Sequence, residues 1–546
     1  MSALNRLVPY YEIKETMNTM DGRNLIGYQY SALTKEIMEA INPETQKRLD
    51  GQFFAASPEE IDQALELATT AFETYKNTSG QQRAAFLNAI ADEILKLGDR
   101  LIERSMKESG LPKGRITGER GRTIGQLRLF AQVVAEGSWV EASIDTAIPD
   151  RTPFPKADIR KMLLPVGPVV VYTASNFPLA FSTAGGDTAS ALASGCPVVV
   201  KAHESHLGTN AMVAYAIQQA AHKTGMPDGV FSSLNGTGPK LGQYLVKHPA
   251  VTSVAFTGSF SAGKAIFDAA TNRKKPIPVF AEMGSVNPVV FLPEILNEKA
   301  EELAQQYAGS VTLGAGQFCT NPGLLIVPEG EATDTFIEHL AIAMNGKPED
   351  VMLNEGVCNN YFTGKEKMLK IPGVRQEGIE KKDRTGWRGQ PTLASVSASD
   401  FMAHAAELQH EVFGPFTLLV KCSDMESCVN VVKVLDGQLT GTIMGQEKEI
   451  VANRSLISAL QNKVGRLLFN GVPTGVEVCH SMHHGGPYPA TTDSRFTSVG
   501  TAAIKRFARP VAFQSCPAGL LPAPLQNKNS DNVWRLLNGE WSNGDC

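Results

Sequence analysis

Between Leu164 and Pro293, short runs of β-branched residues alternate with stretches that have helical periodicity. The five runs span residues 168–172, 197–201, 230–234, 253–257 and 278–281. Strands that are apolar on both faces and alternate with helices are typical of a parallel sheet that is covered on both sides. The segment therefore predicts a doubly wound α/β sheet, in which ligands bind at the carboxyl ends of the strands.

Length and composition bound the remaining possibilities. A chain of 546 residues is too long for one core and suggests about three domains. The net charge of −5, with acidic and basic residues interspersed, gives no sign of a nucleic-acid partner. Eight cysteines without paired spacing do not form a disulfide framework. Because we find no secretory signal and no apolar run long enough to span a bilayer, we expect a cytoplasmic protein with no membrane partner.

The pattern also suggests how the chain is divided. We expect a cofactor-binding domain at 25–295, which begins with helices between Ser57 and Gly137 and continues into the predicted sheet. A second α/β lobe, the catalytic domain, is expected at 296–499. Residues 1–24 read as an N-terminal extension and 517–546 as a C-terminal tail. The strand-like segments 150–164 and 500–516 together predict a small β-segment whose edge another subunit covers, and hence a homodimer or homotetramer.

A glycine-containing turn, Gly258-Ser259-Phe260-Ser261-Ala262-Gly263, stands where a dinucleotide-binding sheet has its phosphate loop. It follows the fourth strand directly and opens a helix. Backbone N–H groups and the positive helix end at such a junction suit a pyrophosphate. An ordinary strand-to-helix turn uses similar residues, so the turn supports a nucleotide site only through its position.

One cysteine lies among small and turn-forming residues. Cys319 follows a long helical pattern and precedes the apolar run Leu324–Pro328. A thiol in this setting is either presented to a cleft or packed as a small hydrophobe. Asn176 and Glu282 each stand at the carboxyl end of a predicted strand, the edge where such sheets bind ligands. Taken singly, the first also fits a turn residue and the second a solvated carboxylate.

Taken together, these motifs resemble the aldehyde dehydrogenase superfamily from about Ile41 to Arg509. The matching segments are Asn176-Phe177-Pro178, Lys201 with Glu204, Phe256-Thr257-Gly258-Ser259 with Gly263, Glu282-Met283-Gly284, Gly316-Gln317-Phe318-Cys319 and Glu411-Val412-Phe413-Gly414-Pro415. Two positions depart from the family pattern, because Ser285 replaces a glycine and Val286 a lysine. The stretch from Phe469 to Arg495 is similar to the branch that contains α-ketoglutaric semialdehyde (2,5-dioxopentanoate) dehydrogenases. An NADP-linked fatty aldehyde dehydrogenase shares that branch.

The resemblance implies an α/β fold with a Rossmann-type cofactor domain, and oxidation of an aldehyde to a carboxylate by NAD or NADP. It makes Cys319 the nucleophile, Asn176 the oxyanion donor and Glu282 the base that activates water. A cofactor-independent thiol hydrolase that pairs Cys319 with a histidine is the alternative from another class. The implied cofactor contacts are Lys201, Glu204, Gly258, Ser259, Gly263, Glu411 and Phe413.

A substrate with a distal carboxylate needs cationic or donor side chains. The candidates are Arg122, Gln126, His480 and Arg495, for each of which a surface or packing role is equally compatible. Arg122 and Gln126 share a helical face. We expect no metal at Cys479–His484, because Ser481 stands where a metalloprotease helix carries its glutamate and the flanking residues favour a loop.

Overall fold

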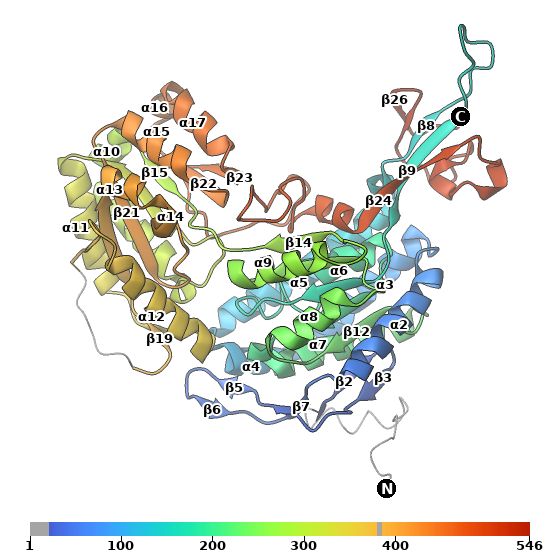
Figure 1. Ribbon diagram of the computed structural model, residues 1–546, viewed down its shortest axis with the longest axis horizontal. Coiled ribbons are helices and arrows are strands. Elements are labelled where there is room, and N and C mark those ends of the chain that lie inside the picture. Colours follow the sequence, from blue (N-terminus) through green and yellow to red (C-terminus); the bar gives the residue numbers. More distant parts are fainter. Residues whose placement is uncertain (1–20, 379–384) are drawn as a thin grey trace.

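Two seven-stranded sheets, each covered by helices, form the two lobes of the protein in the computed structural model (Figure 1). The structure describes residues 21–378 and 385–546. Most of the N-terminal extension predicted at 1–24 therefore lies outside the described residues. None of the described helices is long and apolar enough to cross a membrane.

The first sheet contains the five predicted parallel strands in the order β14-β13-β10-β11-β12. They are β10 (Val169–Tyr172), β11 (Val198–Lys201), β12 (Phe231–Leu234), β13 (Ser253–Thr257) and β14 (Val279–Glu282). Two short strands, β2 (Asn24–Ile26) and β3 (Gln29–Ser31), extend it by antiparallel pairing. The chain adds β11 and β12 on one side of β10, and then β13 and β14 on its other side. The strand order thus reverses beside β10, where a doubly wound sheet binds its ligand.

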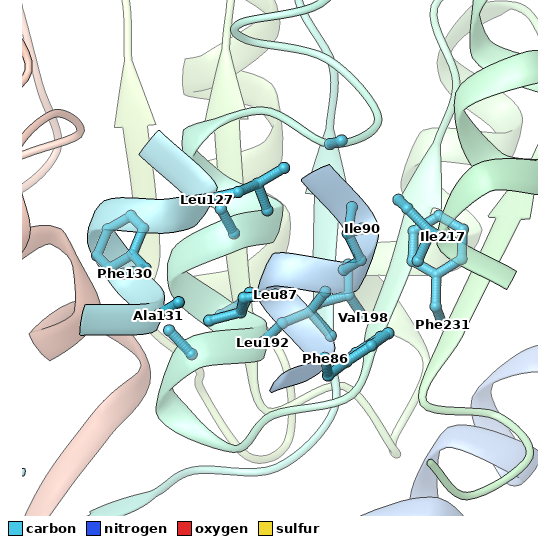
Figure 2. Packing of buried hydrophobic residues seen from close by; sticks show 14 of the residues in the cluster. Phe86, Leu87, Ile90, Leu127, Phe130, Ala131, Leu192, Val198, Ile217 and Phe231 are labelled. Carbon is cyan, nitrogen blue, oxygen red and sulfur yellow. The ribbon is translucent and has the colours of Figure 1, made fainter. Parts of the chain in front are cut away.

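Alternate residues of these strands face two different cores, as the apolar runs predicted. Val169 and Val171 pack with α3 (Gly80–Lys96), α5 (Lys113–Glu136), α6 (Gly186–Ser194) and α7 (Leu207–Lys223). Figure 2 shows this packing around Phe86, Leu127 and Val198. Val170 and Val199 pack on the other face with α2 (Pro58–Tyr75), α8 (Gly238–Lys247) and α9 (Phe260–Thr271).

Helix starts follow their capping residues. Ser57 caps α2 and forms a reciprocal capping box with Glu60, a device that contributes about 1 kcal/mol. After β10, helix α6 begins only at Gly186, and the residues before it form a turn. The reason lies on α5, where the buried Glu119 carboxylate accepts hydrogen bonds from the backbone N–H groups of Leu179 and Ala180 and fixes them in a turn.

The second sheet has the order β18-β20-β21-β16-β15-β22-β23. Its strands are β15 (Val289–Phe291), β16 (Leu324–Pro328), β18 (Arg375–Gln376), β20 (Thr392–Ser397), β21 (Phe416–Cys422), β22 (Gln438–Met444) and β23 (Val464–Phe469). The larger helices of this lobe are α10 (Pro293–Thr312), α11 (Glu331–Asn345), α12 (Glu355–Leu369), α15 (Met425–Val434) and α17 (Arg454–Gln461).

The chain passes between the lobes twice. It leaves the first sheet after Glu282 and enters the second at Val289. After β23 it returns to the first lobe. There the Met283 N–H donates to the Ala490 carbonyl at 2.8 Å, and Glu282 forms an isolated bridge with Thr491. The returning segment thus covers the edge strand β14, although its residues fall within the range predicted for the catalytic lobe.

A five-stranded sheet projects from the first lobe (Figure 1). As expected, the segment near 157–164 pairs with the late strand, as β9 (Ile159–Pro165) and β24 (Ala508–Gln514). On the other side of β9 the order continues with β8 (Ser143–Asp145), β25 (Arg535–Leu537) and β26 (Glu540–Ser542). The predicted C-terminal tail therefore contributes two strands to this sheet. The fully buried Arg535 holds the tail by donating to four backbone carbonyls, those of Pro524, Gln526, Asn527 and Gly544.

Candidate active site

The carboxyl ends of the parallel strands gather the predicted residues of the first lobe. Tyr172 pairs with Lys201 on one side and with Phe256 on the other, and Thr257 pairs with Glu282. The loops after β10, β11, β13 and β14 consequently leave the sheet at one edge. That edge carries Asn176, Lys201, the Gly258 turn and Glu282.

The loop that carries Cys319 comes from the second lobe and has an unusual backbone. It follows α10 and the 3₁₀ turn Leu313–Gly316, and it ends where β16 begins. Ala315 has φ +56°, a conformation that costs a side-chain-bearing residue of the order of 1 kcal/mol or more. At Gly316, with φ +65°, a Cβ would lie 2.2 Å from the Gly414 carbonyl oxygen. The nucleophile loop is therefore packed directly against the loop that carries Glu411.

A buried asparagine that sequence reasoning missed fixes this loop. The Asn287 side-chain amide donates to the carbonyls of Cys319, at 2.9 Å, and Asn321, at 2.8 Å. Asn287 itself has φ +49° and is 1% exposed. In the sequence it reads as an ordinary turn residue before Pro288, so only the fold reveals what its amide reaches.

The thiol, a histidine and the predicted base form a cluster in which their side-chain S, N and O atoms lie within 4.8 Å of one another. Cys319 Sγ is 3.6 Å from His484 Nε2, which lies 3.0 Å from Glu282 Oε1. The Ser498 hydroxyl donates to the other carboxylate oxygen, Glu282 Oε2, at 2.6 Å. His484 and Glu282 are buried, whereas Cys319 keeps part of its surface exposed. His484 lies in a loop, as predicted, and the sequence singled it out only as part of a histidine cluster.

The surroundings shift the pKa of the Cys319 thiol upward and the pKa of the Glu282 carboxyl group downward. Burial raises the pKa of Cys319 well above its usual value, and the neighbouring Glu282 carboxylate raises it further, while Arg122 acts against both. Burial alone would raise the pKa of Glu282 as well. The charge and hydrogen bond of His484, with the Ser498 hydroxyl, outweigh it and leave the Glu282 pKa below its usual value. The site thus holds a protonated thiol beside an ionised base.

Asn176 reaches the nucleophile loop from the first lobe. Its side-chain amide donates to the Gln317 carbonyl at 3.1 Å, two residues before Cys319. The next residue, Phe177, lies edge-on to Phe318 with ring centroids 5.7 Å apart. The Arg115 guanidinium lies over both rings, 4.4 Å and 4.6 Å from their centroids. A cation and two aromatic rings thus border the approach to the thiol.

The Gly258 turn has the features of a pyrophosphate site. Gly258 and Ser259 are exposed at the N-terminus of α9, and the Ser259 hydroxyl caps that helix by accepting from Ala262 N–H. Gly263 lies against Met283, so α9 approaches the strand end closely. Within the described chain, the buried Thr257 Oγ1 has no hydrogen-bond partner. These residues fit a dinucleotide whose phosphates meet the helix N-terminus.

The other predicted cofactor residues lie in two places, the end of β11 and a pocket in the second lobe. Lys201 Nζ lies 3.3 Å from a Glu204 carboxylate oxygen, at the end of β11. Glu411 and Phe413 line a pocket in the second lobe together with Phe318. Burial raises the pKa of Glu411 to about 8, and nearby Glu282 adds to the shift. At neutral pH this carboxyl group is therefore mostly protonated before any ligand binds.

Of the four candidate substrate residues, the structure brings Arg122 within electrostatic range of the thiol. Its guanidinium donates to the Val476 carbonyl and lies over the Phe181 ring. Gln126 is buried on the same face of α5, next to Gly186. His480 is exposed and contacts Thr501, and the highly exposed Arg495 pairs with Asp493.

A second arginine near the thiol escaped the sequence analysis. Arg466 on β23 interacts electrostatically with Cys319 and donates to the carbonyls of Pro473 and Gly475, each at 2.7 Å. Arg122 and Arg466 therefore hold the same loop from two sides. Both have a buried Nε atom without a hydrogen-bond partner among the residues the structure describes. Arg466 belongs to none of the motifs found in the sequence, so the sequence gave no indication of its role.

Fold and site together define a thiol-dependent enzyme with a dinucleotide site next to its nucleophile. The comparisons agree with this class. A family model for the aldehyde dehydrogenase family matches residues 30–490. The chain is 49% identical to α-ketoglutaric semialdehyde dehydrogenase 2 of Azospirillum brasilense, over 95% of this chain and 99% of that one. It is 44% identical to an α-ketoglutaric semialdehyde dehydrogenase of Acinetobacter baylyi, over 96% and 99%.

Among solved structures, a Thermus 1-pyrroline-5-carboxylate dehydrogenase with bound NAD has a TM-score of 0.75 and 22% identity, over 94% of this chain and 99% of that one. At that identity the likeness shows the fold alone. The chain belongs to the aldehyde dehydrogenase family. The expected fold and reaction, NAD(P)-dependent oxidation of an aldehyde to a carboxylate, are thereby confirmed.

Proposed function

We propose that this enzyme oxidises α-ketoglutaric semialdehyde (2,5-dioxopentanoate) to 2-oxoglutarate. The observation that carries the proposal is a pair of arginines, Arg122 and Arg466, within electrostatic range of Cys319. Identities of 49% and 44% to two enzymes of that name support it. Burial lowers the pKa of both arginines, which means that each would gain from a counter-charge.

The geometry suggests how the substrate is oriented. Its aldehyde carbon has to reach Cys319 Sγ, and its carboxylate then extends along α5 past the rings of Phe177 and Phe181. Arg122 Nε, which the backbone of the 473–476 loop leaves free, is placed to donate to that carboxylate. Arg115, over Phe177 and Phe318, is the second cation on this path. Arg115 already pairs with Glu119 at 3.3 Å, so the argument against an unbranched fatty aldehyde rests on Arg122, whose buried Nε such a substrate would leave without an acceptor.

We assign the chemical steps to the chain's own groups as follows. Glu282, through His484, removes the proton of Cys319, and the thiolate adds to the aldehyde carbon to give a thiohemiacetal. The Asn176 amide donates to the oxyanion, a contact that contributes about a hundredfold to a thousandfold in rate in comparable sites. The Gly258 turn and Glu411 would hold NAD(P), which would supply the acceptor for the hydride that leaves the thiohemiacetal carbon. Glu282 then takes one proton from the water that attacks the resulting thioester, and the C–S bond breaks to give the carboxylic acid and the Cys319 thiolate. The acid proton passes to the thiolate, which regenerates the thiol and releases the carboxylate.

The contact between Cys319 and His484 also suits a thiol hydrolase, the alternative from another class. In our assignment this contact serves the activation of the thiol, because His484 passes the proton of Cys319 to Glu282. A cofactor-independent hydrolase would cleave thioesters as fast without NAD(P) as with it.

The test is a substrate panel with NAD and NADP supplied separately, followed by absorbance of the reduced cofactor. Arg122→Gln should lower kcat/KM for 2,5-dioxopentanoate by about tenfold to a hundredfold, the effect of losing a hydrogen bond to a charged group. An uncharged aldehyde of similar length should be much less affected. Arg128→Gln, on an exposed face of the same helix, is the matched control. Equal losses with both aldehydes would contradict the substrate assignment.

We further propose that the protein is a homodimer or homotetramer that assembles through the projecting sheet. The support is β24, an edge strand with alternately exposed residues and no neighbour beyond it in its sheet as the structure describes it. Eight free cysteines support a reducing compartment such as the cytoplasm.

A further inference from the structure

A second cavity adjoins Glu282, and we name it the rear cavity. Its lining includes Glu282, His484, Ser498, Thr491 and Asp493, but neither Cys319 nor Asn176. It offers about 20 Å³ to the centres of water molecules. One water needs roughly 10–15 Å³ by this measure, so the cavity can hold water.

Polar groups lead from the buried base to the surface along this cavity. The Ser498 hydroxyl donates to Glu282 Oε2 at 2.6 Å. At the other end, the Asp493 side chain is 22% exposed and pairs with Arg495, which is 81% exposed. His484 Nδ1 is buried and, within the described residues, has no hydrogen-bond partner, which a water in the cavity can supply.

The reaction requires an exit for protons. Oxidation by the overall equation RCHO + H₂O + NAD(P)⁺ → RCOO⁻ + NAD(P)H + 2 H⁺ releases two protons, and the base receives those of the thiol and the attacking water. In the proposed reaction the substrate is bound to Cys319, so it would occupy the Cys319 side of Glu282 while this happens. A base that cannot return its proton to solvent cannot act in the next turnover.

Resting on the proposed function, we propose that the rear cavity is the proton exit of the active site. Protonated Glu282 passes its proton to Ser498 Oγ, the hydroxyl proton of Ser498 passes to water in the cavity, and that water delivers a proton to solvent at Asp493. Ser498 and Asp493 act through Glu282 and are positioning residues.

The other charged groups around Glu282 are committed to different contacts. Arg506, which also lines the cavity, pairs with Asp187 at 2.8 Å and donates to Ser190. Cys319 and Glu411 lie on the cofactor and substrate side. His484 contacts both Cys319 and Glu282, so it can share the proton with the base before the proton leaves.

The experiment compares Asp493→Asn with Asp92→Asn, a matched exposed carboxylate that pairs with Arg128 far from the site. Asparagine keeps the oxygen that accepts from Arg495 N–H. In weak buffer, Asp493→Asn should turn over about tenfold more slowly, below the 10²–10⁴ of a direct base, whereas cofactor reduction in a single turnover should stay at the wild-type rate. A high concentration of a small buffer such as imidazole should restore turnover, since it can accept the proton at the cavity mouth.

Ser498→Ala and Ser498→Thr provide the second measurement. The alanine variant should lose turnover and show a larger solvent deuterium isotope effect, and the threonine variant, which keeps the hydroxyl, should recover most of the rate. A loss in Asp493→Asn that buffer does not restore, or turnover equal to wild type in Asp493→Asn and Ser498→Ala, overturns the proton exit. If wild-type enzyme reduces no cofactor with 2,5-dioxopentanoate, the proposed function fails instead, and the two failures are thus distinguishable.

Discussion

The two sheets present their functional residues at opposite ends of their strands. In the first sheet, Asn176, Lys201 and Glu282 stand at or just after the ends of β10, β11 and β14. In the second sheet the order is inverted. Asn287, Cys319 and Glu411 precede β15, β16 and β21 by two to five residues. The carboxyl edge of one sheet therefore faces the amino edge of the other.

This difference separates two kinds of requirement. The carboxyl edge of a parallel sheet offers helix N-termini and open loops, which suit a dinucleotide and its base. The amino edge of the second sheet offers loops that are held by strands behind them, as Asn287 holds the backbone at Cys319. In the proposed mechanism the first sheet therefore supplies the cofactor site and the base, and the second sheet positions the nucleophile. Substitutions at the two edges should fail in different ways.

The largest effect is expected on the second edge. Cys319→Ala removes the atom that bonds to the substrate, so aldehyde oxidation should fall by about 10⁴-fold or more, as for other covalent nucleophiles. The cofactor should still bind with its normal Kd, measured by quenching of protein fluorescence. Cys479→Ala is the control, and residual oxidation within tenfold of wild type would remove Cys319 from its role.

On the first edge, Glu282→Gln should lower turnover by about 10²- to 10⁴-fold, the range of a positioned base. Because Glu282 acts on both the thiol and the attacking water, cofactor reduction in a single turnover and hydrolysis of the thioester should both become slower. In the wild-type enzyme the lowered pKa of Glu282 keeps the carboxylate ionised into mildly acidic solution, so the acid side of the turnover profile should extend below the pKa usual for a glutamate. A variant that keeps wild-type turnover would assign the base elsewhere.

A smaller effect is expected for Asn287, which supports the backbone at Cys319 without taking part in the chemistry. Asn287→Ala leaves the Cys319 carbonyl without its donor, whereas the Asn321 carbonyl keeps the Gly323 N–H at 2.9 Å, and an unpaired buried group costs about 1–3 kcal/mol. The melting temperature should fall, and Cys319 should react with a thiol reagent at an altered rate. Asn462→Ala, at an exposed asparagine that donates to the Ser458 carbonyl, is the control. Unchanged stability and thiol reactivity in Asn287→Ala would show that the Cys319 loop keeps its conformation without the Asn287 side chain.

The smallest effect should be one of pH on cofactor affinity. With a pKa of about 8, Glu411 is about one-tenth ionised at pH 7 and about nine-tenths ionised at pH 9. The carboxylate is the form that accepts from ribose hydroxyls without competing with its own proton. The Kd for NAD should therefore tighten by about tenfold between these pH values, and Glu411→Gln should abolish the trend. A Kd that is flat with pH in wild-type enzyme would contradict the raised pKa or the contact.

The difference between the two sheets also explains which parts of the fold and of the site could be predicted from the sequence. The strands of the first sheet are continuous apolar runs, and the position of Asn176 and Glu282 at their ends follows from the rule for doubly wound sheets. Helix starts with capping residues, such as Ser57, were predicted well, whereas the start of α6 depended on the distant Glu119.

Cys319 and Glu411 on the second edge were found from their motifs, but three other residues near Cys319 needed the tertiary structure. Asn287, Arg466 and His484 act through partners that are distant in the sequence, and no local pattern marks such a partner. Ser498 is a single hydroxyl in a loop whose only signal is its contact with Glu282. Conversely, Arg495 and His480 were chosen for charge and motif, and the structure shows both exposed to solvent, with Arg495 paired to Asp493 and His480 in contact with Thr501.

The return of residues 490–492 to β14 has a consequence for how the enzyme can be made. During synthesis the first sheet emerges long before this segment, and until the segment docks β14 is an open edge with unpaired backbone groups, a template for aggregation. A chain cut before Ala490 would also lack Ser498, one partner of the Glu282 carboxylate. Chains that end before Ala490 should therefore misfold and be degraded, and an enzyme with Cys319 but without the Ser498 contact to Glu282 should not accumulate.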